Sequence, residues 1–156
     1  MPSVKKAAKA KAKLRQGAGG RLAKAVPPKL DNAGRPIFSF QFADRNYSGS
    51  WSWCSGDDVR ELLDFLCEMS QLTWSEIHNQ QTGGQSRHKK HHSQGLGTVC
   101  PEAQARLTAL GLDEVFEDYF RFRLGGTKRL WGTRIGDVFY VLWWDAHHQV
   151  YPTEQS

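Results

Sequence analysis

The sequence has no apolar run long enough to cross a membrane, which takes about 18 consecutive apolar residues. It also has no Cys-x-x-Cys pair, because its three cysteines, Cys54, Cys67 and Cys100, are widely spaced and odd in number. This pattern argues against a disulfide framework. We therefore expect a cytoplasmic protein with no membrane partner.

Acidic residues are nearly absent from the first 35 residues, which hold ten lysines and arginines against one acid, Asp31, and so carry a net charge of +9. The whole chain of 156 residues has a formal charge of +5, which leaves −4 for residues 36–156. The basic character therefore belongs to one end of the chain. It does not by itself make the remainder a nucleic-acid-binding domain.

Residues 1–35 are rich in alanine and lysine and have few apolar side chains, with glycines and prolines at intervals. Such a composition predicts a disordered basic tail. Two interpretations stay open. The tail becomes ordered on a polyanion, or it is a solubilising arm or a vector-encoded or misassigned start.

Residues 36–156 are predicted to form one domain, since the whole chain, with 39% hydrophobic and 12% aromatic content, has enough apolar residues for a single core. Alternating side chains over residues 37–42 predict a first strand. Two acids then precede an apolar stripe that predicts a helix, with one face made of Val59, Leu62, Leu63, Leu66, Cys67 and Met69.

Two further helices are predicted from their ends. Thr73 and Glu76 form a capping-box pattern that begins a short second helix. Pro101 is placed to open a third helix, and Gly111 to end it. Residues 79–97 between them are polar and glycine-rich, which predicts a long loop.

The last part of the chain, residues 119–151, has two turn signals, Gly125-Gly126 and Gly136-Asp137, between three strand-like runs. Because glycine reaches the positive φ of short hairpin loops, this spacing predicts an antiparallel meander. The final run, 138–144, is apolar throughout, as expected of a strand covered on both faces. The predicted fold is therefore α+β, an antiparallel sheet of one N-terminal strand plus the meander, with helices packed on one face.

The meander places apolar and cationic side chains on opposite faces of its first strand. Phe120, Phe122 and Leu124 share one face, and Arg121 and Arg123 share the other. The sequence then adds more cations and a polar ending: Lys128, Arg129, Arg134, His147, His148 and Tyr151.

These residue types can transfer protons and bind phosphate. Histidine titrates near neutrality, and arginine binds phosphate with two parallel hydrogen bonds. Asp145 either caps the turn that follows the last strand or raises the basicity of His147 or His148.

The predicted long loop carries a second basic group, Arg87, His88, Lys89, Lys90, His91 and His92. A flexible basic loop is one interpretation, and participation in the phosphate-binding face is another. A metal site is poorly supported, because zinc takes four ligands and no recognisable set is present.

The order of elements and the C-terminal meander resemble the RelE/ParE superfamily of small bacterial toxins. The segment RLWGTRIGDVFYVLWWDAHHQVYP is also similar to the ends of short, uncharacterised bacterial proteins that look RelE-like. Members that cut mRNA on the ribosome use cations on one sheet face and a tyrosine or histidine near the C-terminus. The resemblance implies these residues here: Arg121 or Arg123, Lys128, Arg129, Arg134, His147, His148 and Tyr151. It also implies cleavage of RNA without a metal or cofactor, since attack of a ribose 2′-OH on the adjacent phosphate needs a base, an acid, and cations that stabilise the developing negative charge.

The resemblance implies a bacterial toxin that binds RNA, on the ribosome, cleaves it as an endoribonuclease and has a cognate antitoxin. Two features depart from the family pattern, the net acidic domain and the histidine-containing loop. ParE-like relatives keep the fold without ribonuclease activity. The alternative is therefore a non-catalytic interaction module that binds a protein through tryptophans such as Trp51 and Trp53. A third hypothesis is binding of DNA through the basic tail.

Overall fold

The computed structural model describes residues 31–83, 85 and 87–152. The predicted basic tail lies outside the described residues except for residues 31–35. In this part of the chain, no helix has both the length and the apolar character that a membrane span requires.

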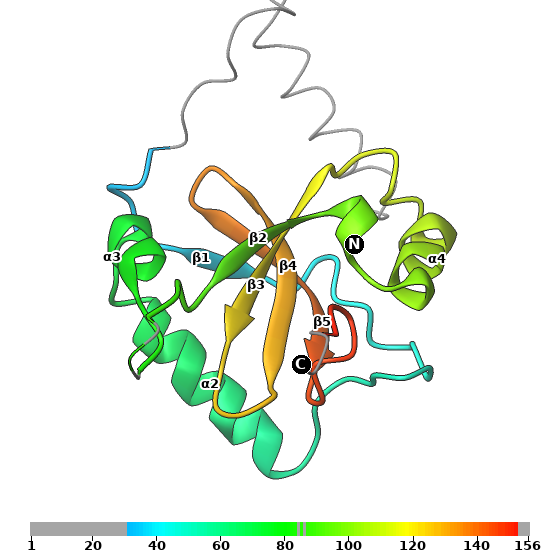
Figure 1. Ribbon diagram of the computed structural model, residues 1–156, viewed down its shortest axis with the longest axis horizontal. Coiled ribbons are helices and arrows are strands. Elements are labelled where there is room, and N and C mark those ends of the chain that lie inside the picture. Colours follow the sequence, from blue (N-terminus) through cyan, green and yellow to red (C-terminus); the bar gives the residue numbers. More distant parts are fainter. Residues whose placement is uncertain (1–30, 84, 86, 153–156) are drawn as a thin grey trace, which may run out of the picture.

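A five-stranded mixed sheet forms the centre of the molecule, with the strand order β1-β5-β4-β3-β2 (Figure 1). Its strands are β1 (Ile37–Ser39), β2 (His92–Gly95), β3 (Asp118–Arg123), β4 (Arg129–Ile135) and β5 (Val138–Asp145).

The predicted meander is confirmed. β3, β4 and β5 pair antiparallel in sequence order, and a β-bulge interrupts the β4–β5 register at Trp131 and Gly132. Gly126 and Gly136 lie in the two turns and both have φ of 59°. A side chain at either position would strain the backbone, so these glycines allow the tight connections that bring the three strands together.

The sheet differs from the predicted one in two respects. β1 pairs parallel with β5, so the sheet is mixed rather than antiparallel. β1 also ends at Ser39, earlier than predicted, because the chain turns at Phe40, whose carbonyl accepts a hydrogen bond from the amide of Ala43. The second difference is β2, which pairs with β3 and forms within the predicted loop.

The described residues form three α-helices: α2 (Asp57–Met69), α3 (Trp74–Asn79) and α4 (Pro101–Leu110). A short 3₁₀ turn, η2 (Leu96–Thr98), precedes α4. The predicted helix ends are confirmed. The Thr73 hydroxyl accepts a hydrogen bond of 3.2 Å from the amide of Glu76, and Gly111 ends α4 with φ of 68°.

The helices lie on both faces of the sheet, which corrects the prediction of one covered face. α2 and α3 pack on the first face, and α4 packs on the second (Figure 1). Because β5 separates the two cores, its side chains are buried on both sides, as predicted. Phe139 and Val141 belong to the first core, and Leu142 and Trp143 to the second.

α2 buries a different face from the predicted one. Leu62, Leu66 and Met69 are buried as expected, and Phe65 joins them. The remaining predicted core positions, Val59, Leu63 and Cys67, are exposed. A run of apolar residues around a helix does not reveal which flank the sheet covers, and this choice was decided by packing against β1 and β3.

Candidate functional site

Three arginines lie together on the second face of the sheet. We call Arg121 and Arg123 of β3 and Arg129 of β4 the arginine cluster. Strand alternation places them on the same face as Tyr119 and Trp131, which belong to the second core. Arg121 and Arg129 are each only 7% exposed. Two cationic side chains are thus buried on the second face of the sheet.

The arginine cluster has little compensating negative charge. None of the ion pairs within the described residues includes one of its members. The Nε atoms of Arg121 and Arg129 are also buried without a hydrogen-bond partner in this part of the chain. Because buried charges are normally paired, this arrangement leaves unused capacity to bind an anion.

Burial also lowers the pKa of both arginines. Desolvation is the main cause for Arg129, whose pKa falls to about 10, and the neighbouring Arg123 and Arg121 lower it further. The pKa of Arg121 is lowered mainly by desolvation as well. Both guanidinium groups remain protonated at neutral pH, so the cluster is a buried concentration of positive charge.

The turn after β5 brings His148 to the cluster. His148 has φ of 57°, the one positive φ outside glycine in the described chain. Its Nε2 lies 3.2 Å from Nη1 of Arg121. Because a left-handed conformation costs a non-glycine residue about 1–2 kcal/mol, the surrounding contacts must hold this turn in place.

Asp145 holds the turn. Its two carboxylate oxygens accept hydrogen bonds of 2.9 Å from the amides of Gln149 and Val150. This agrees with the first of the two predicted roles, a turn cap. The second predicted role was to raise the basicity of a neighbouring histidine. At His148 this effect is smaller than the opposing ones, because desolvation, Arg129 and Arg121 lower its pKa more than Asp145 raises it.

His148 is therefore a neutral imidazole at neutral pH. The guanidinium of Arg121 has only N–H donors, so it donates to Nε2 of His148, and this assigns the imidazole proton to Nδ1. The imidazole has a lone pair at Nε2 that faces the cationic group. An anion bound by Arg121 would compete for this donor and leave the lone pair free.

Aromatic rings border Arg121 on both sides. Its guanidinium carbon lies 5.5 Å from the centre of the Tyr151 ring and 5.9 Å from that of Trp131. Trp131 was not predicted as a site residue. Its position two residues after Arg129 on a strand is the signal that would have identified it, since such residues share a face.

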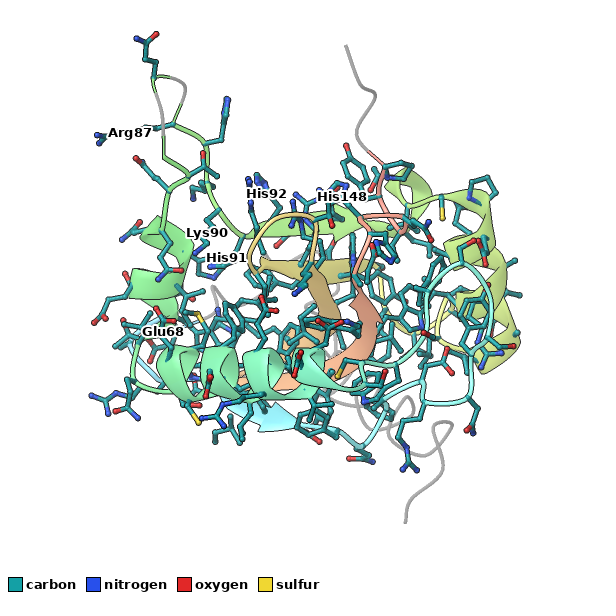
Figure 2. All side chains as sticks on the ribbon, turned by 90° about the horizontal axis from the view of Figure 1, so that it is seen from below. Glu68, Arg87, Lys90, His91, His92 and His148 are labelled. Atoms are coloured by element: carbon teal, nitrogen blue, oxygen red, sulfur yellow. The ribbon has the colours of Figure 1, made fainter. Side chains whose placement is uncertain are left out.

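His92 completes the group from the edge strand. It lies directly opposite Arg121 in the β2–β3 register, and desolvation and Arg121 lower its pKa. Figure 2 shows His92 and His148 side by side at one end of the sheet, with Arg87 far from them. The pKa of each histidine responds to Arg121, in agreement with this view.

Three predicted site residues lie elsewhere. Arg134 packs over the ring of Trp74 at 4.2 Å on the first face and donates hydrogen bonds to Asn32 and to the carbonyl of Asp31. Lys128 pairs with Asp58 and Glu61 of α2. His147 is exposed. Strand alternation places Arg134 on the opposite face from Arg129, and Lys128 and His147 lie in the turns outside the strands.

The predicted basic loop does not act as a unit. Arg87, His88 and Lys89 are exposed on a hairpin in which Gln81 and Lys89 pair. His91 instead is 3% exposed and packs among phenylalanines of the first core.

His91 serves to hold the edge of the sheet. Its Nδ1 accepts a hydrogen bond from the amide of Arg123, and its Nε2 lies 2.7 Å from the side-chain oxygen of Gln80. Desolvation is the main cause that lowers its pKa to about 3. His91 is therefore a neutral structural residue and not a phosphate ligand, which corrects its predicted role.

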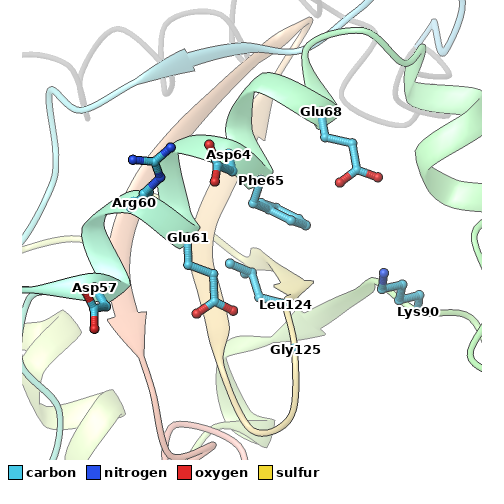
Figure 3. Close-up of a pocket in the computed structure, with 9 residues that line it drawn as sticks. All are labelled: Asp57, Arg60, Glu61, Asp64, Phe65, Glu68, Lys90, Leu124 and Gly125. Carbon is cyan, nitrogen blue, oxygen red and sulfur yellow. The ribbon is translucent and has the colours of Figure 1, made fainter.

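A groove of about 630 Å³ runs beside α2, away from the arginine cluster (Figure 3). Four carboxylates line it, and Lys90 points across it toward the helix. Their charge would repel a phosphate backbone. The carboxylates are those of Asp57, Glu61, Asp64 and Glu68.

In the described part of the chain, no group of three or more histidine, cysteine, aspartate or glutamate side chains is arranged to hold a metal ion. No family model, curated protein or solved structure matches this chain. The candidate site consists of buried guanidinium groups, a neutral histidine and two aromatic rings.

Proposed function

We propose that this protein binds the phosphate backbone of RNA at the arginine cluster and cleaves it as a metal-independent endoribonuclease. The observation that carries the proposal is the pair of buried arginines, Arg121 and Arg129, with unpartnered Nε donors and no ion pair among the described residues. A site that offers only N–H donors selects an anion. Arg123 at its rim extends the cationic surface along a strand of RNA.

His148 is suited to act as the base. Binding of a phosphate by Arg121 releases Nε2 of His148 from its hydrogen bond with the guanidinium. The neutral imidazole then accepts the proton of a ribose 2′-OH. Its lowered pKa keeps it unprotonated at neutral pH, which is the state that a base requires.

The reaction breaks one bond and forms another. The 2′-oxygen attacks the adjacent phosphorus, and the bond from phosphorus to the 5′-oxygen of the next nucleotide breaks, giving a 2′,3′-cyclic phosphate and a 5′-hydroxyl. Arg121 and Arg129 stabilise the negative charge that develops on the phosphate oxygens. We assign Tyr151, whose ring lies over Arg121, to protonate the leaving oxygen.

The order of elements supports a RelE-like protein. β1, α2 and α3 come first and the C-terminal meander last, with β2, η2 and α4 between them, and the resemblance to toxins that cut mRNA on the ribosome rests on this strand, helix, helix and meander order. We propose on this basis that the protein inhibits translation and has a cognate antitoxin.

The alternative of a non-catalytic interaction module loses its main observation. Five of the six tryptophans are buried, and Trp51, which stacks on Trp143 in the second core, is 4% exposed. Trp53 is the one that remains half-buried. Trp51 is therefore a core residue and not an interface anchor.

The test is cleavage of mRNA in a reconstituted translation reaction, with the ends mapped by primer extension. We expect cuts with the wild-type chain and with His147→Gln, because His147 is exposed and outside the site. We expect none with His148→Gln. Intact mRNA with the wild-type chain, in the presence and absence of ribosomes, would refute catalysis.

A further inference from the structure

The large exposed hydrophobic residues of the described chain gather at one edge of the molecule. Ile37 and Phe40 lie in and just after β1, the outermost strand, and are 61% and 49% exposed. Val59 and Leu63 of α2 are 50% and 59% exposed. A contiguous apolar surface of this kind marks an interaction site more often than isolated apolar residues do.

This surface is hollowed. A groove of about 500 Å³ separates α2 from the segment after β1, and its walls include Phe40, Trp53, Val59, Leu62 and Leu63. Arg45 is the one charged residue among those that line it. The groove therefore accepts apolar side chains without placing like charges against each other.

The exposed residues of α2 form a straight ridge. Val59, Leu63 and Cys67 follow each other at intervals of four, so they lie in one row along the helix. All three are exposed. Rows of this type are the ones that pack into each other when two helices cross.

We propose that a second copy of this chain covers the ridge and the groove, with the two α2 helices antiparallel about a two-fold axis at Leu63. In this arrangement Leu63 contacts the partner's Leu63, and Val59 contacts the partner's Cys67. The ridge is symmetric about its middle residue, as an isologous interface requires.

Charge complementarity favours a second copy as the occupant. Arg60 and Asp64 are exposed on the flank beside the ridge, one on each side of Leu63 along the helix. Antiparallel packing brings Arg60 toward the partner's Asp64, and the symmetry repeats the contact. Arg60 and Asp64 line the acidic groove together with Glu61 and Glu68, which lie further round the helix from the ridge.

The interface leaves the arginine cluster open in both copies, because that cluster lies on the second face of the sheet and α2 on the first. The proposal thus goes beyond the RNA site and does not depend on it. A dimer would present two such sites to one strand of RNA.

Sedimentation velocity of the full chain over a wide concentration range tests the proposal. We expect a reversible dimer, with Leu63→Asp weakening it by about tenfold or more because it places a charge at the centre of the interface. Glu68→Gln, on the same helix but off the ridge, is the matched control and should dimerise like the wild type. Because Leu63 is exposed, Leu63→Asp should leave the fold intact, which a circular dichroism spectrum would verify.

A charge exchange tests the geometry. Arg60→Asp and Asp64→Arg should each weaken the dimer, and the double variant should restore it. On a Cys67→Ser background, Leu63→Cys should form an intermolecular disulfide.

A chain that is monomeric at every concentration would overturn the proposal, and so would a dimer that survives Leu63→Asp. A monomer whose Leu63→Cys thiol is shielded from a small thiol reagent would show instead that residues 1–30 of the same chain cover the groove, which also overturns it.

Discussion

Nη1 of Arg121 lies 3.2 Å from Nε2 of His148, so a buried cation donates to the lone pair of a neutral imidazole. Desolvation, Arg129 and Arg121 lower the pKa of His148, and the carboxylate of Asp145 opposes this effect. Asp145 in turn is engaged by two backbone amides. The arrangement keeps positive charge in a poorly solvated environment, and a bound anion would neutralise that charge.

The first prediction concerns the cost of this charge. Arg121→Met should raise the free energy of unfolding by about 1 kcal/mol or more, and the melting temperature with it. The reason is that a flexible apolar side chain of similar length replaces an unpaired buried cation. Thermal denaturation followed by circular dichroism measures the effect. A lower melting temperature would mean that the contacts with Trp131 and Tyr151 outweigh the desolvation of the guanidinium.

The second prediction concerns acid. The pKa of His91 is about 3 in the folded protein and about 6.5 when exposed, because burial disfavours its charged form. Its contribution to stability is therefore fully present above pH 6.5 and is lost as the pH falls toward 3, by at most about 1.4 kcal/mol per pH unit.

Urea denaturation at a series of pH values measures this slope. His91→Gln should make it shallower below pH 6.5. The control His147→Gln, at an exposed position, should leave it as in the wild type. Equal slopes for wild type and His91→Gln would refute the assignment of His91 as a buried neutral residue.

The third prediction concerns Gly132, which lies on β4 beside the β-bulge. A Cβ at position 132 would meet the carbonyl oxygen of Tyr140 and the ring of Phe139, whereas one at Gly97 would meet open space. Gly132→Ala should therefore lower the free energy of unfolding by about 1–3 kcal/mol, as overpacking does. Gly97→Ala, its control, should stay close to wild type, and similar denaturation midpoints for the two variants would contradict this account.

The fourth prediction concerns the turn that carries His148. In Asp145→Asn one of the amides of Gln149 and Val150 loses its acceptor, since an amide side chain presents a single carbonyl oxygen. We expect a loss of about 1–3 kcal/mol in stability and a loss of RNA cleavage, because His148 is no longer held at Arg121. Denaturation and the primer-extension assay give both readouts, and full cleavage by a destabilised variant would count against a positioning role.

The fold was predictable where local chemistry decides it. Gly126, Gly136 and Gly111 fix turns and a helix end through positive φ, and Thr73 caps α3, so these features followed from the sequence. The edge strand β2 did not. Its four residues, His92–Gly95, are polar and adopt a strand because β3 supplies the pairing.

The candidate site was predictable in part for the same reason. Strand alternation placed Arg121 and Arg123 on one face, and the structure adds Arg129, His148 and Tyr151 to them. Arg134 was wrongly grouped with Arg129, because the two are five residues apart on β4 and strand alternation therefore places them on opposite faces. His91 and His92 are adjacent in sequence, yet the strand places them on opposite faces, one in the core and one at the site.

The most direct test of the account is the affinity of the full chain for a single-stranded RNA, measured by fluorescence anisotropy at one fixed salt concentration. The Arg121→Met/Arg129→Met double variant should bind roughly hundredfold to ten-thousandfold more weakly, since each of the two charge-assisted contacts contributes about 1.5–3 kcal/mol. Arg134→Met, which removes one positive charge from the other face, should bind like the wild type. Equal weakening by Arg134→Met, or wild-type affinity in the double variant, would contradict the assignment of the arginine cluster as the RNA site.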